Sequence, residues 1–284
     1  MVRGSSWRDH LDRAWFSRPG VRTREAVAAA AGLLTPSWCV GCGAEETDLC
    51  EECAYDVRLL TRDPYRAEAA APALPVVGQT EDQLRVLPVI AAGTYGTLLS
   101  RVMLGFKDHE RIPLDRVLAP ALGRAVEAAL SQLCTEAPLI LVPATSLKAR
   151  MRRSHDPVPH LVRRMEGRSA LRGAQLAEGM LAQPPRAAAV GMLPGGGRQK
   201  GQKGRSLADR RRRLTGAFRV TDRGREELPG REVLLVDDVL TTGATIHALY
   251  ELLTEAGAEV RGAAVMAAAE VPRGGDASQG SGLE

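Results

Sequence analysis

Short apolar runs alternate along this chain with segments in which apolar residues recur every three or four positions. An uninterrupted run is typical of a strand buried on both faces of a sheet, and the wider spacing is typical of a helix with one buried face. The runs that predict strands are residues 86–95, 139–142, 217–220, 233–236 and 260–268. The segments that predict helices are residues 96–107, 113–133, 156–165 and 244–256.

This alternation predicts an α/β fold, with a parallel sheet of about five strands, helices on both faces and a site at the carboxyl ends of the strands. Residues 175–183 fit either a strand or an irregular turn, and residues 221–232 read as a charged turn. Composition divides the chain further. We expect an N-terminal arm with a short helix at 1–36, a cysteine-rich module at 37–60, a proline-containing linker at 61–85, the α/β domain at 86–270 and a disordered tail at 271–284.

The most informative stretch is 233–247, which reads VLLVDDVLTTGATIH. Two carboxylates, Asp237 and Asp238, follow the apolar run, where they repel each other and lose solvation unless a positive or hydroxyl-rich ligand satisfies them. Small and hydroxylated residues then precede a helix, where backbone N–H groups and the helix dipole favour an anion. These residues are Thr241, Thr242, Gly243, Ala244 and Thr245. The alternative is an ordinary strand-to-helix turn with capping residues.

An acidic pair beside a phosphate cradle suits a ribose 5-phosphate, and the string resembles the phosphoribosyl pyrophosphate signature of type I phosphoribosyltransferases. The resemblance implies that Asp237 and Asp238 hold the ribose hydroxyls, that residues 241–245 hold the 5-phosphate, and that Mg²⁺ accompanies phosphoribosyl pyrophosphate. It also makes Lys107, Arg150 and Arg153 candidates for the pyrophosphate side. The basic, glycine-rich stretch 191–213 lies where such enzymes have a flexible loop over the site.

Four of the five cysteines stand in the pattern C-x2-C-x7-C-x2-C. Each C-x2-C pair can turn both sulfurs toward one point, so two pairs supply four thiolates in tetrahedral reach of a structural zinc ion. These ligand candidates are Cys39, Cys42, Cys50 and Cys53. Two disulfides, four free thiols and an iron–sulfur centre are the alternatives. The fifth, Cys134, reads as a small buried hydrophobe.

A four-cysteine module before a phosphoribosyltransferase-like domain resembles the ComF family over residues 36–268. Within 202–218, Gln202, Gly204, Ser206 and Arg210 also match the family pattern. The resemblance implies a link to natural competence and DNA uptake. A second hypothesis is therefore a non-catalytic adaptor or nucleotide-sugar sensor, in which residues 198–213 and the cysteine module contact single-stranded DNA or a DNA-uptake helicase. The four arginines at 210–213 fit a solvated helix face equally well.

Composition and charge narrow these hypotheses only slightly. The formal net charge is +4, which fits phosphate-bearing ligands but is too small to indicate nucleic acid by itself. Aromatic residues make up 4% of the chain, which disfavours a surface built for base stacking. We see no apolar run long enough for a membrane span and no secretory signal in the Arg-rich start, so we expect a cytoplasmic protein.

Overall fold

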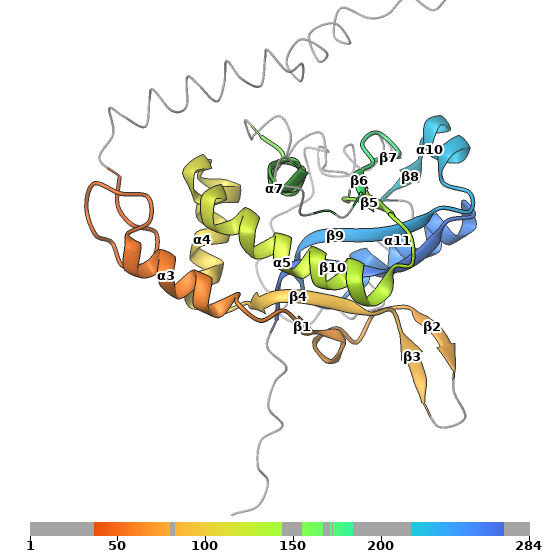
Figure 1. The fold of residues 1–284 in the computed structure, drawn as a ribbon, viewed down its shortest axis with the longest axis horizontal. Coiled ribbons are helices and arrows are strands. Elements are labelled where there is room, and N and C mark those ends of the chain that lie inside the picture. Colours follow the sequence, from red (N-terminus) through yellow and green to blue (C-terminus); the bar gives the residue numbers. More distant parts are fainter. Residues whose placement is uncertain are drawn as a thin grey trace, which may run out of the picture.

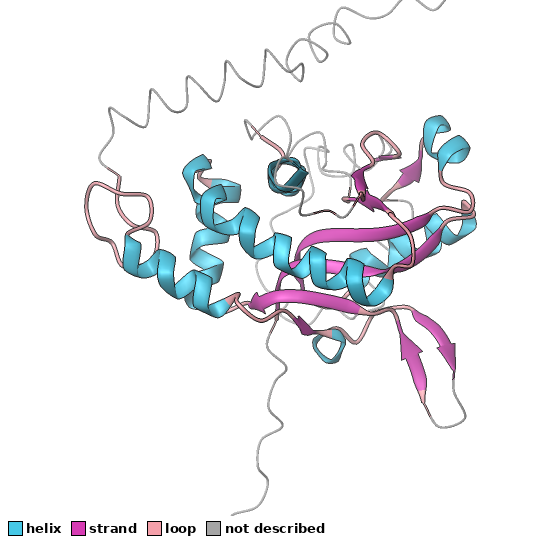
Figure 2. Cartoon of the chain, viewed as in Figure 1, coloured by secondary structure: helices cyan, strands magenta, loops and turns pink. Residues whose placement is uncertain are grey.

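A mixed but mainly parallel sheet forms the centre of the protein, with helices on both faces (Figures 1 and 2). The computed structural model describes residues 37–79, 83–143, 155–166, 171, 173–183 and 217–269. The expected N-terminal helix, the 191–213 loop and the 271–284 tail lie outside these residues.

Six strands make up the sheet in the spatial order β1-β4-β10-β9-β5-β6. Their bounds are β1 Tyr65–Arg66, β4 Val89–Thr94, β5 Leu139–Leu141, β6 Gln175–Leu176, β9 Glu232–Leu240 and β10 Glu259–Ala268. Every neighbouring pair is parallel except β1 with β4. The parallel sheet that the apolar runs predict is therefore confirmed, with a short antiparallel strand added at one edge.

The helices divide into two layers that pack on opposite faces of the sheet. One face is covered by α4 (Thr97–Asp108), α5 (Asp115–Leu133, preceded by the 3₁₀ turn η2, Ile112–Leu114) and α7 (Pro157–Glu166); α11 (Ala244–Glu255) covers the other. Alternate residues of β9 serve the two cores. Leu234 and Val236 join the cluster with α5, while Val233 and Leu235 join the cluster with α11. The run Val233–Val236 of this strand is uninterrupted and apolar because it is buried on both sides.

Residues 61–85 do not run free, although their composition suggested a linker. Within this stretch β1 pairs with β4, and Ala67, Ala71 and Leu74 are buried in the core that α11 covers. A short 3₁₀ helix, η1 (Glu68–Ala70), separates β1 from a two-stranded hairpin of β2 (Val76–Gln79) and β3 (Leu84–Val86). The prolines that suggested a linker lie between these short elements, where no ladder hydrogen bond is lost.

The charged turn expected at 221–232 contains a short helix instead, α10 (Asp222–Glu227). Thr221 caps this helix by accepting a hydrogen bond from Gly224 N, at 3.1 Å. Gly224 is required there, since a Cβ atom would approach Met180 O to 2.7 Å. Nearby, β7 (Leu181–Ala182) pairs with β8 (Arg219–Val220). No helix among the described residues is long and apolar enough to span a membrane.

A buried carboxylate holds the amino-terminal end of the sheet together. Glu232, 7% exposed at the start of β9, accepts hydrogen bonds from Thr135 N at 3.0 Å, Glu136 N at 3.1 Å and Arg261 Nε at 2.8 Å. Burial alone would raise the pKa of Glu232, but the bonds from Thr135, Glu136 and Arg261 outweigh it and lower this pKa. The carboxylate therefore ties the segment before β5 to β9 and β10.

Glu232→Ala should lower the free energy of unfolding by about 3 kcal/mol, because it removes the buried acceptor that Thr135, Glu136 and Arg261 share. Urea unfolding monitored by circular dichroism measures this loss. The matched control is Glu259→Ala, since Glu259 contacts the same Arg261 from an exposed position; it should cost less than about 1 kcal/mol. Equal costs for the two variants would contradict the role assigned to Glu232.

Candidate functional site

The acidic pair lies at the point where the sheet opens. The sequence suggested that Asp237 and Asp238 follow the strand, but β9 continues through both to Leu240. It does so because its pairing with β10 continues, with Asp237 opposite Val265. On its other side β9 loses its neighbour earlier, since β5 ends with Leu141 opposite Leu235.

The helices that follow these two neighbouring strands cover opposite faces of the sheet, α7 after β5 and α11 after β9. This divergence creates a switch point, the usual place for a ligand in an open α/β sheet. Asp237 and Asp238 lie at this crevice. The carboxyl-end location that the alternation predicts for the site thus coincides with the acidic pair.

Each aspartate also organises the backbone of β9 beyond the end of β5. Asp237 Oδ1 accepts from Asp238 N, and Asp238 Oδ1 accepts from Val239 N, both at 2.8 Å. These bonds occupy one oxygen of each carboxyl group and hold each side chain in place. The acidic pair is therefore oriented before any ligand arrives.

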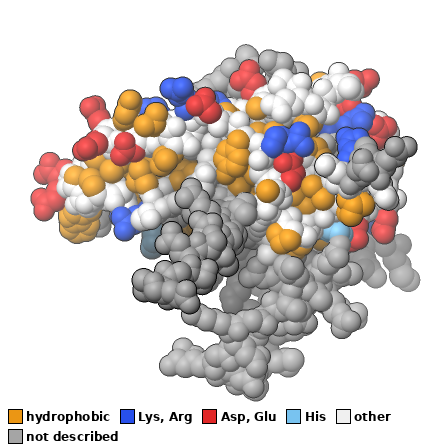
Figure 3. All heavy atoms as spheres, turned by 90° about the horizontal axis from the view of Figure 1, so that it is seen from below, with side chains coloured by type: hydrophobic (Ala, Val, Ile, Leu, Met, Phe, Trp, Pro, Cys, Tyr) orange, Lys and Arg blue, Asp and Glu red, His pale blue; other side chains and the backbone are white. Residues whose placement is uncertain are grey.

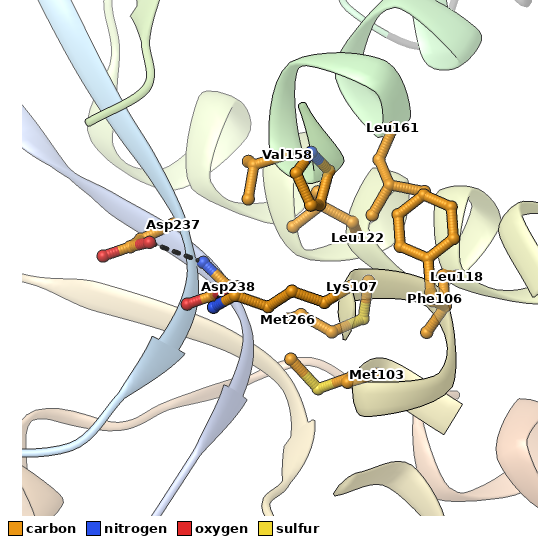
Figure 4. A pocket seen from close by; sticks show the side chains of 11 residues that line it. Met103, Phe106, Lys107, Leu118, Leu122, Val158, Leu161, Asp237, Asp238 and Met266 are labelled. Carbon is orange, nitrogen blue, oxygen red and sulfur yellow. Dashed lines mark hydrogen bonds and ion pairs between the residues drawn. The ribbon is translucent and has the colours of Figure 1, made fainter. Parts of the chain in front are cut away.

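Lys107, in the last turn of α4, forms an ion pair with Asp238 Oδ2 (Figure 4). The two residues are 131 positions apart in sequence and are both partly exposed.

A narrow and mostly apolar pocket lies beside Lys107 and Asp238, between α4, α5, α7 and the ends of β9 and β10 (Figure 4). Its apolar wall includes Met103, Phe106 and Met266. The low polarity of this wall strengthens the electrostatic interactions of the charged groups at its edge.

The two aspartates differ in electrostatic environment. Burial, followed by the negative charge of Asp238, raises the pKa of Asp237 from 3.8 to about 7, against the opposing effects of Asp238 N–H and Lys107. Although the residue keeps some exposure, protein atoms surround its carboxyl group. A ligand that donates hydroxyl protons or brings a cation would favour the ionised form of Asp237.

The raised pKa of Asp237 predicts a specific dependence of stability on pH. Between about pH 4 and pH 7 the folded protein binds more protons at this residue than the unfolded chain, so its free energy of unfolding falls as pH rises through this window. We expect a contribution on the order of 3 kcal/mol. Urea unfolding of the wild-type protein and of Asp237→Asn at pH 4.5, 6 and 7.5 measures it. Parallel pH curves for the two proteins would contradict the assignment, and Asp63→Asn serves as the exposed control.

The predicted phosphate cradle is built around Gly243. This residue has φ +83° and is the N-cap of α11, so no side chain caps the helix from this position. A Cβ atom here would lie 2.9 Å from Leu74 Cδ2, so both the backbone angle and the packing exclude a larger residue. Thr242 Oγ1 lies 3.4 Å from Ala244 N, a long contact that leaves the first turn open to an anion.

The structure brings together most, but not all, of the residues that the sequence singled out. Asp237 and Asp238 are separated from the cradle 241–245 by two residues of β9, and Lys107 reaches Asp238 from α4. Arg150 and Arg153 lie outside the described residues, so their place on the pyrophosphate side stays a prediction. Sequence reasoning missed the segment 71–75 and His247, which contact the cradle from behind. For these contacts the sequence offered one signal, the presence of a histidine in the first turn of the helix that follows the cradle.

The four cysteines predicted to bind metal converge on one point. Their Sγ atoms all lie within 4.8 Å of one another, and Cys50 Sγ is 3.7 Å from Cys39 Sγ and 3.6 Å from Cys42 Sγ. All four are free thiols, and these distances far exceed the roughly 2.05 Å of a disulfide bond. Tetrahedral zinc with Zn–S bonds of about 2.3 Å would separate its sulfurs by about 3.8 Å. The cluster therefore fits a metal such as zinc.

Backbone geometry explains how the sequence forms this cluster. Gly43 adopts φ +84°, and a Cβ on Gly41 would lie 2.6 Å from Cys53 Sγ. Cys50 is the N-cap of α3 (Glu51–Leu60), and its Sγ accepts a hydrogen bond from Cys53 N at 3.5 Å.

The thiols of the cluster differ in pKa. Burial raises the pKa of Cys39, but hydrogen bonds from backbone N–H groups outweigh burial and lower this pKa to about 6. Burial and the neighbouring sulfurs raise the pKa of Cys53. A cation would relieve this repulsion.

The cysteine module packs directly on α4, the helix that carries Lys107. Arg101 Nη1 donates to Gly41 O at 2.9 Å, and a Cβ on Gly105 would lie 3.0 Å from Val40 Cγ1. Beyond the helix end, Arg111 donates to Trp38 O and lies 3.5 Å from Asp48 Oδ1. The module thus contacts α4 at its middle and its last turn, and the chain just beyond it, near the acidic pair.

The surface of the cysteine module is acidic. Residues 37–60 contain six carboxylates and one arginine, and Figure 3 shows acidic side chains at the end of the molecule where α3 lies. The carboxylates are Glu45, Glu46, Asp48, Glu51, Glu52 and Asp56. Such a surface repels a phosphate backbone. Contact between this module and DNA, part of the adaptor hypothesis, is therefore not supported by its charge, and the basic stretch 198–213 lies outside the described residues.

Comparison with known proteins matches residues 195–278 to the phosphoribosyl transferase domain family. The chain is 60% identical over 40 residues to adenine phosphoribosyltransferase of Mycolicibacterium gilvum, which covers 14% of this chain and 22% of that protein. It is 45% identical over 58 residues to competence protein F of Haemophilus influenzae, covering 20% of this chain and 25% of that protein. It is 56% identical over 54 residues to adenine phosphoribosyltransferase of Nocardia farcinica, covering 19% and 28%. These matches span about a quarter of each relative.

Proposed function

We propose that this ComF-like chain, which combines a phosphoribosyl transferase domain, similarity to competence protein F and a four-cysteine cluster, binds phosphoribosyl pyrophosphate together with Mg²⁺. The observation that carries the proposal is the juxtaposition of an oriented acidic pair with an open helix N-terminus at the switch point of the sheet. A ribose 5-phosphate presents vicinal hydroxyls for the acidic pair and a phosphate for the helix N-terminus. The string shared with phosphoribosyltransferases, Asp-Asp followed by Thr-Thr-Gly, supports the same ligand.

In this proposal each element has one task. Asp237 Oδ2 and Asp238 Oδ2, the latter in exchange for Lys107, accept hydrogen bonds from the two ribose hydroxyls, and the backbone N–H groups of residues 241–245 bind the 5-phosphate. Carboxylate oxygens are also ligands that Mg²⁺ prefers, so the acidic pair fits the ion that accompanies the pyrophosphate. The ion would supply charge neutralisation on the leaving group. Lys107, which pairs with Asp238, is proposed to bind the same anion, and Arg150 and Arg153 are proposed to join it.

The reaction class that follows is phosphoribosyl transfer. The bond between ribose C1 and the pyrophosphate oxygen breaks, its electron pair leaves with pyrophosphate, and a lone pair of the acceptor forms the new bond to C1 while the acceptor loses a proton to solvent. Positive charge develops on the ribose in between. The chain contributes by fixing the sugar at both ends and by placing carboxylates beside the developing charge. The four-cysteine cluster is proposed to hold zinc structurally, because four protein ligands leave no open position for chemistry.

Isothermal titration calorimetry with Mg²⁺ and phosphoribosyl pyrophosphate tests the proposal, with ribose 5-phosphate and 2-deoxyribose 5-phosphate as matched ligands. We expect binding of the first two, and about tenfold weaker binding of the deoxy sugar, which lacks one hydroxyl for the acidic pair. A panel of nucleobases and amines, each assayed for pyrophosphate release, then identifies an acceptor. Lack of binding by both ribose phosphates would refute the assignment. Release without any acceptor would instead indicate hydrolysis.

A link to competence is proposed from the matched relative's name alone, and it concerns the role of the protein rather than its chemistry. Direct binding of single-stranded DNA would give an affinity that falls steeply with salt. Replacing the arginines at 210–213 by glutamine would then reduce that slope. Salt-independent or undetectable binding would leave the sugar-phosphate site as the sole proposed binding function of the chain.

A further inference from the structure

We propose that His247 is a positioning residue for phosphate binding, acting through the segment 71–75, which we name the strap. The inference rests on the proposed function and deepens it, because it explains what holds the cradle in its open shape. Neither element touches the acidic pair. Both contact the reverse side of the loop whose N–H groups are proposed to bind the 5-phosphate.

The strap contacts the cradle at two consecutive residues. Ala73 N donates to Thr242 O at 2.8 Å, which fixes the direction of the Thr242 carbonyl. Leu74, 5% exposed, lies against Gly243, close enough that a Cβ on this glycine would be 3.1 Å from Leu74 N. The positive φ of Gly243 is therefore matched to the presence of the strap. If the strap moved, the loop would lose both the hydrogen bond and the packing that select this conformation.

His247 fixes the strap to α11. Its ring is buried, with 7% exposed, and Nδ1 lies 2.9 Å from Ala73 O. Its other nitrogen, Nε2, lies 3.1 Å from Glu251 Oε1, one turn further along the helix. A carbonyl oxygen can only accept a hydrogen bond, so Nδ1 is the donor to Ala73 O, while Nε2 contacts the carboxyl group of Glu251. The imidazole is thereby held at both ends, and with it Ala73, whose N–H and C=O are both used.

Three hydrogen bonds link the cradle, the strap and the first turn of α11 in a closed ring. Thr242 is held by Ala73, Ala73 is held by His247, and His247 N donates back to Gly243 O at 2.9 Å within the first turn of α11. Preorganised N–H groups bind an anion without the cost of ordering a loop. Removing the His247 link should therefore reduce phosphate affinity, even though the histidine does not contact the phosphate.

Two substitutions at one position separate this role from general stability. His247→Phe keeps a ring of similar volume and removes both ring nitrogens. His247→Asn retains an amide donor near the position of Nδ1 and can still bond Ala73 O. We expect ribose 5-phosphate to bind His247→Phe at least tenfold more weakly than wild type, and His247→Asn within about threefold of wild type. Calorimetry well below the melting temperature of each variant gives the affinities. Glu251→Gln is the control that changes the exposed partner of His247 Nε2 and leaves the bond to Ala73 O in place.

A second measurement follows the strap directly. Amide hydrogen exchange at Ala73 should be faster in ligand-free His247→Phe than in the wild-type protein, and ribose 5-phosphate should slow it in the wild type. A lower melting temperature of His247→Phe with unchanged affinity would show a merely structural role and overturn the inference. So would equal losses in the Phe and Asn variants. Failure of the wild-type protein itself to bind a ribose phosphate would instead refute the proposed function, and the inference with it.

Discussion

Replacing both acidic residues, Asp237→Asn with Asp238→Asn, should weaken the binding of phosphoribosyl pyrophosphate by a factor of roughly 10² to 10⁴. Each hydrogen bond from a ribose hydroxyl to a carboxylate contributes about 1.5–3 kcal/mol, and the amides accept such bonds less strongly. The binding isotherm at pH 8 with saturating Mg²⁺ measures the effect. At that pH most Asp237 side chains of the wild-type protein are ionised, since their pKa is about 7.

The double variant should remain folded, which makes the loss of binding interpretable. Asp237→Asn removes a carboxyl group that burial and a like charge disfavour in its ionised form. Asp238→Asn leaves Lys107 without its partner, but that lysine keeps 35% of its side chain exposed and can be solvated. The matched control is Asp63→Asn with Asp222→Asn, two exposed carboxylates outside β9. Retained affinity in the double variant would exclude the acidic pair as the ribose site.

Removing two ligands of the cysteine cluster, Cys39→Ser with Cys50→Ser, should abolish stoichiometric metal binding and lower the melting temperature by roughly 10 °C. Residues 37–60 contribute few buried apolar side chains, chiefly Val57, so the metal is expected to hold the module folded. Elemental analysis and differential scanning calorimetry measure the two effects. One zinc equivalent in the wild-type protein is the expected baseline.

The fifth cysteine supplies the control for this experiment. Cys134 is partly buried at the end of α5, where burial and then Glu232 raise its pKa to about 11, so it stays a neutral thiol. Cys134→Ser should keep the full metal content and lose little stability. Visible absorption from bound iron would favour an iron–sulfur centre, and wild-type protein without any metal would contradict the four-thiolate reading altogether.

Loss of the cysteine cluster in the Cys39→Ser with Cys50→Ser variant should also affect the sugar-phosphate site. Because Gly41 and Val40 pack on Arg101 and Gly105, loss of the module removes support from the last turns of α4. Lys107 lies in these turns. The serine variant should therefore bind phosphoribosyl pyrophosphate more weakly, while binding of the shorter ribose 5-phosphate, which has no pyrophosphate for Lys107, should change less.

Local strings predicted the acidic pair, the cradle and the four cysteines because each depends on residues close together in sequence. The Asp-Asp pair needs only a buried strand before it, and Gly243 needs only the turn into α11. Strand and helix order followed in the same way from uninterrupted or three-to-four spaced apolar residues. The precise end of β9 was missed, because pairing with β10 carries the strand past the acidic residues.

The strap could not be predicted in this way. Its buried residues, Ala71, Ala73 and Leu74, follow no regular period, and the strand that precedes it, β1, has two residues. Only tertiary contacts with Thr242 and His247 give it a role. The short helix α10 had a local signal, Thr221 before an acidic residue, but Gly224 obscured it. That glycine reflects contact with Met180 across the fold rather than a helix preference.

The ion pair between Lys107 and Asp238 means that the resting site is already neutralised from within. An arriving sugar hydroxyl competes with the ammonium group of Lys107 for the carboxylate of Asp238. Ligand binding therefore exchanges one partner of this carboxylate for another. The lysine that is released becomes available to the anionic end of the ligand at the moment the sugar end is seated. A compound with both ends should consequently gain more from this site than the sum of its two halves.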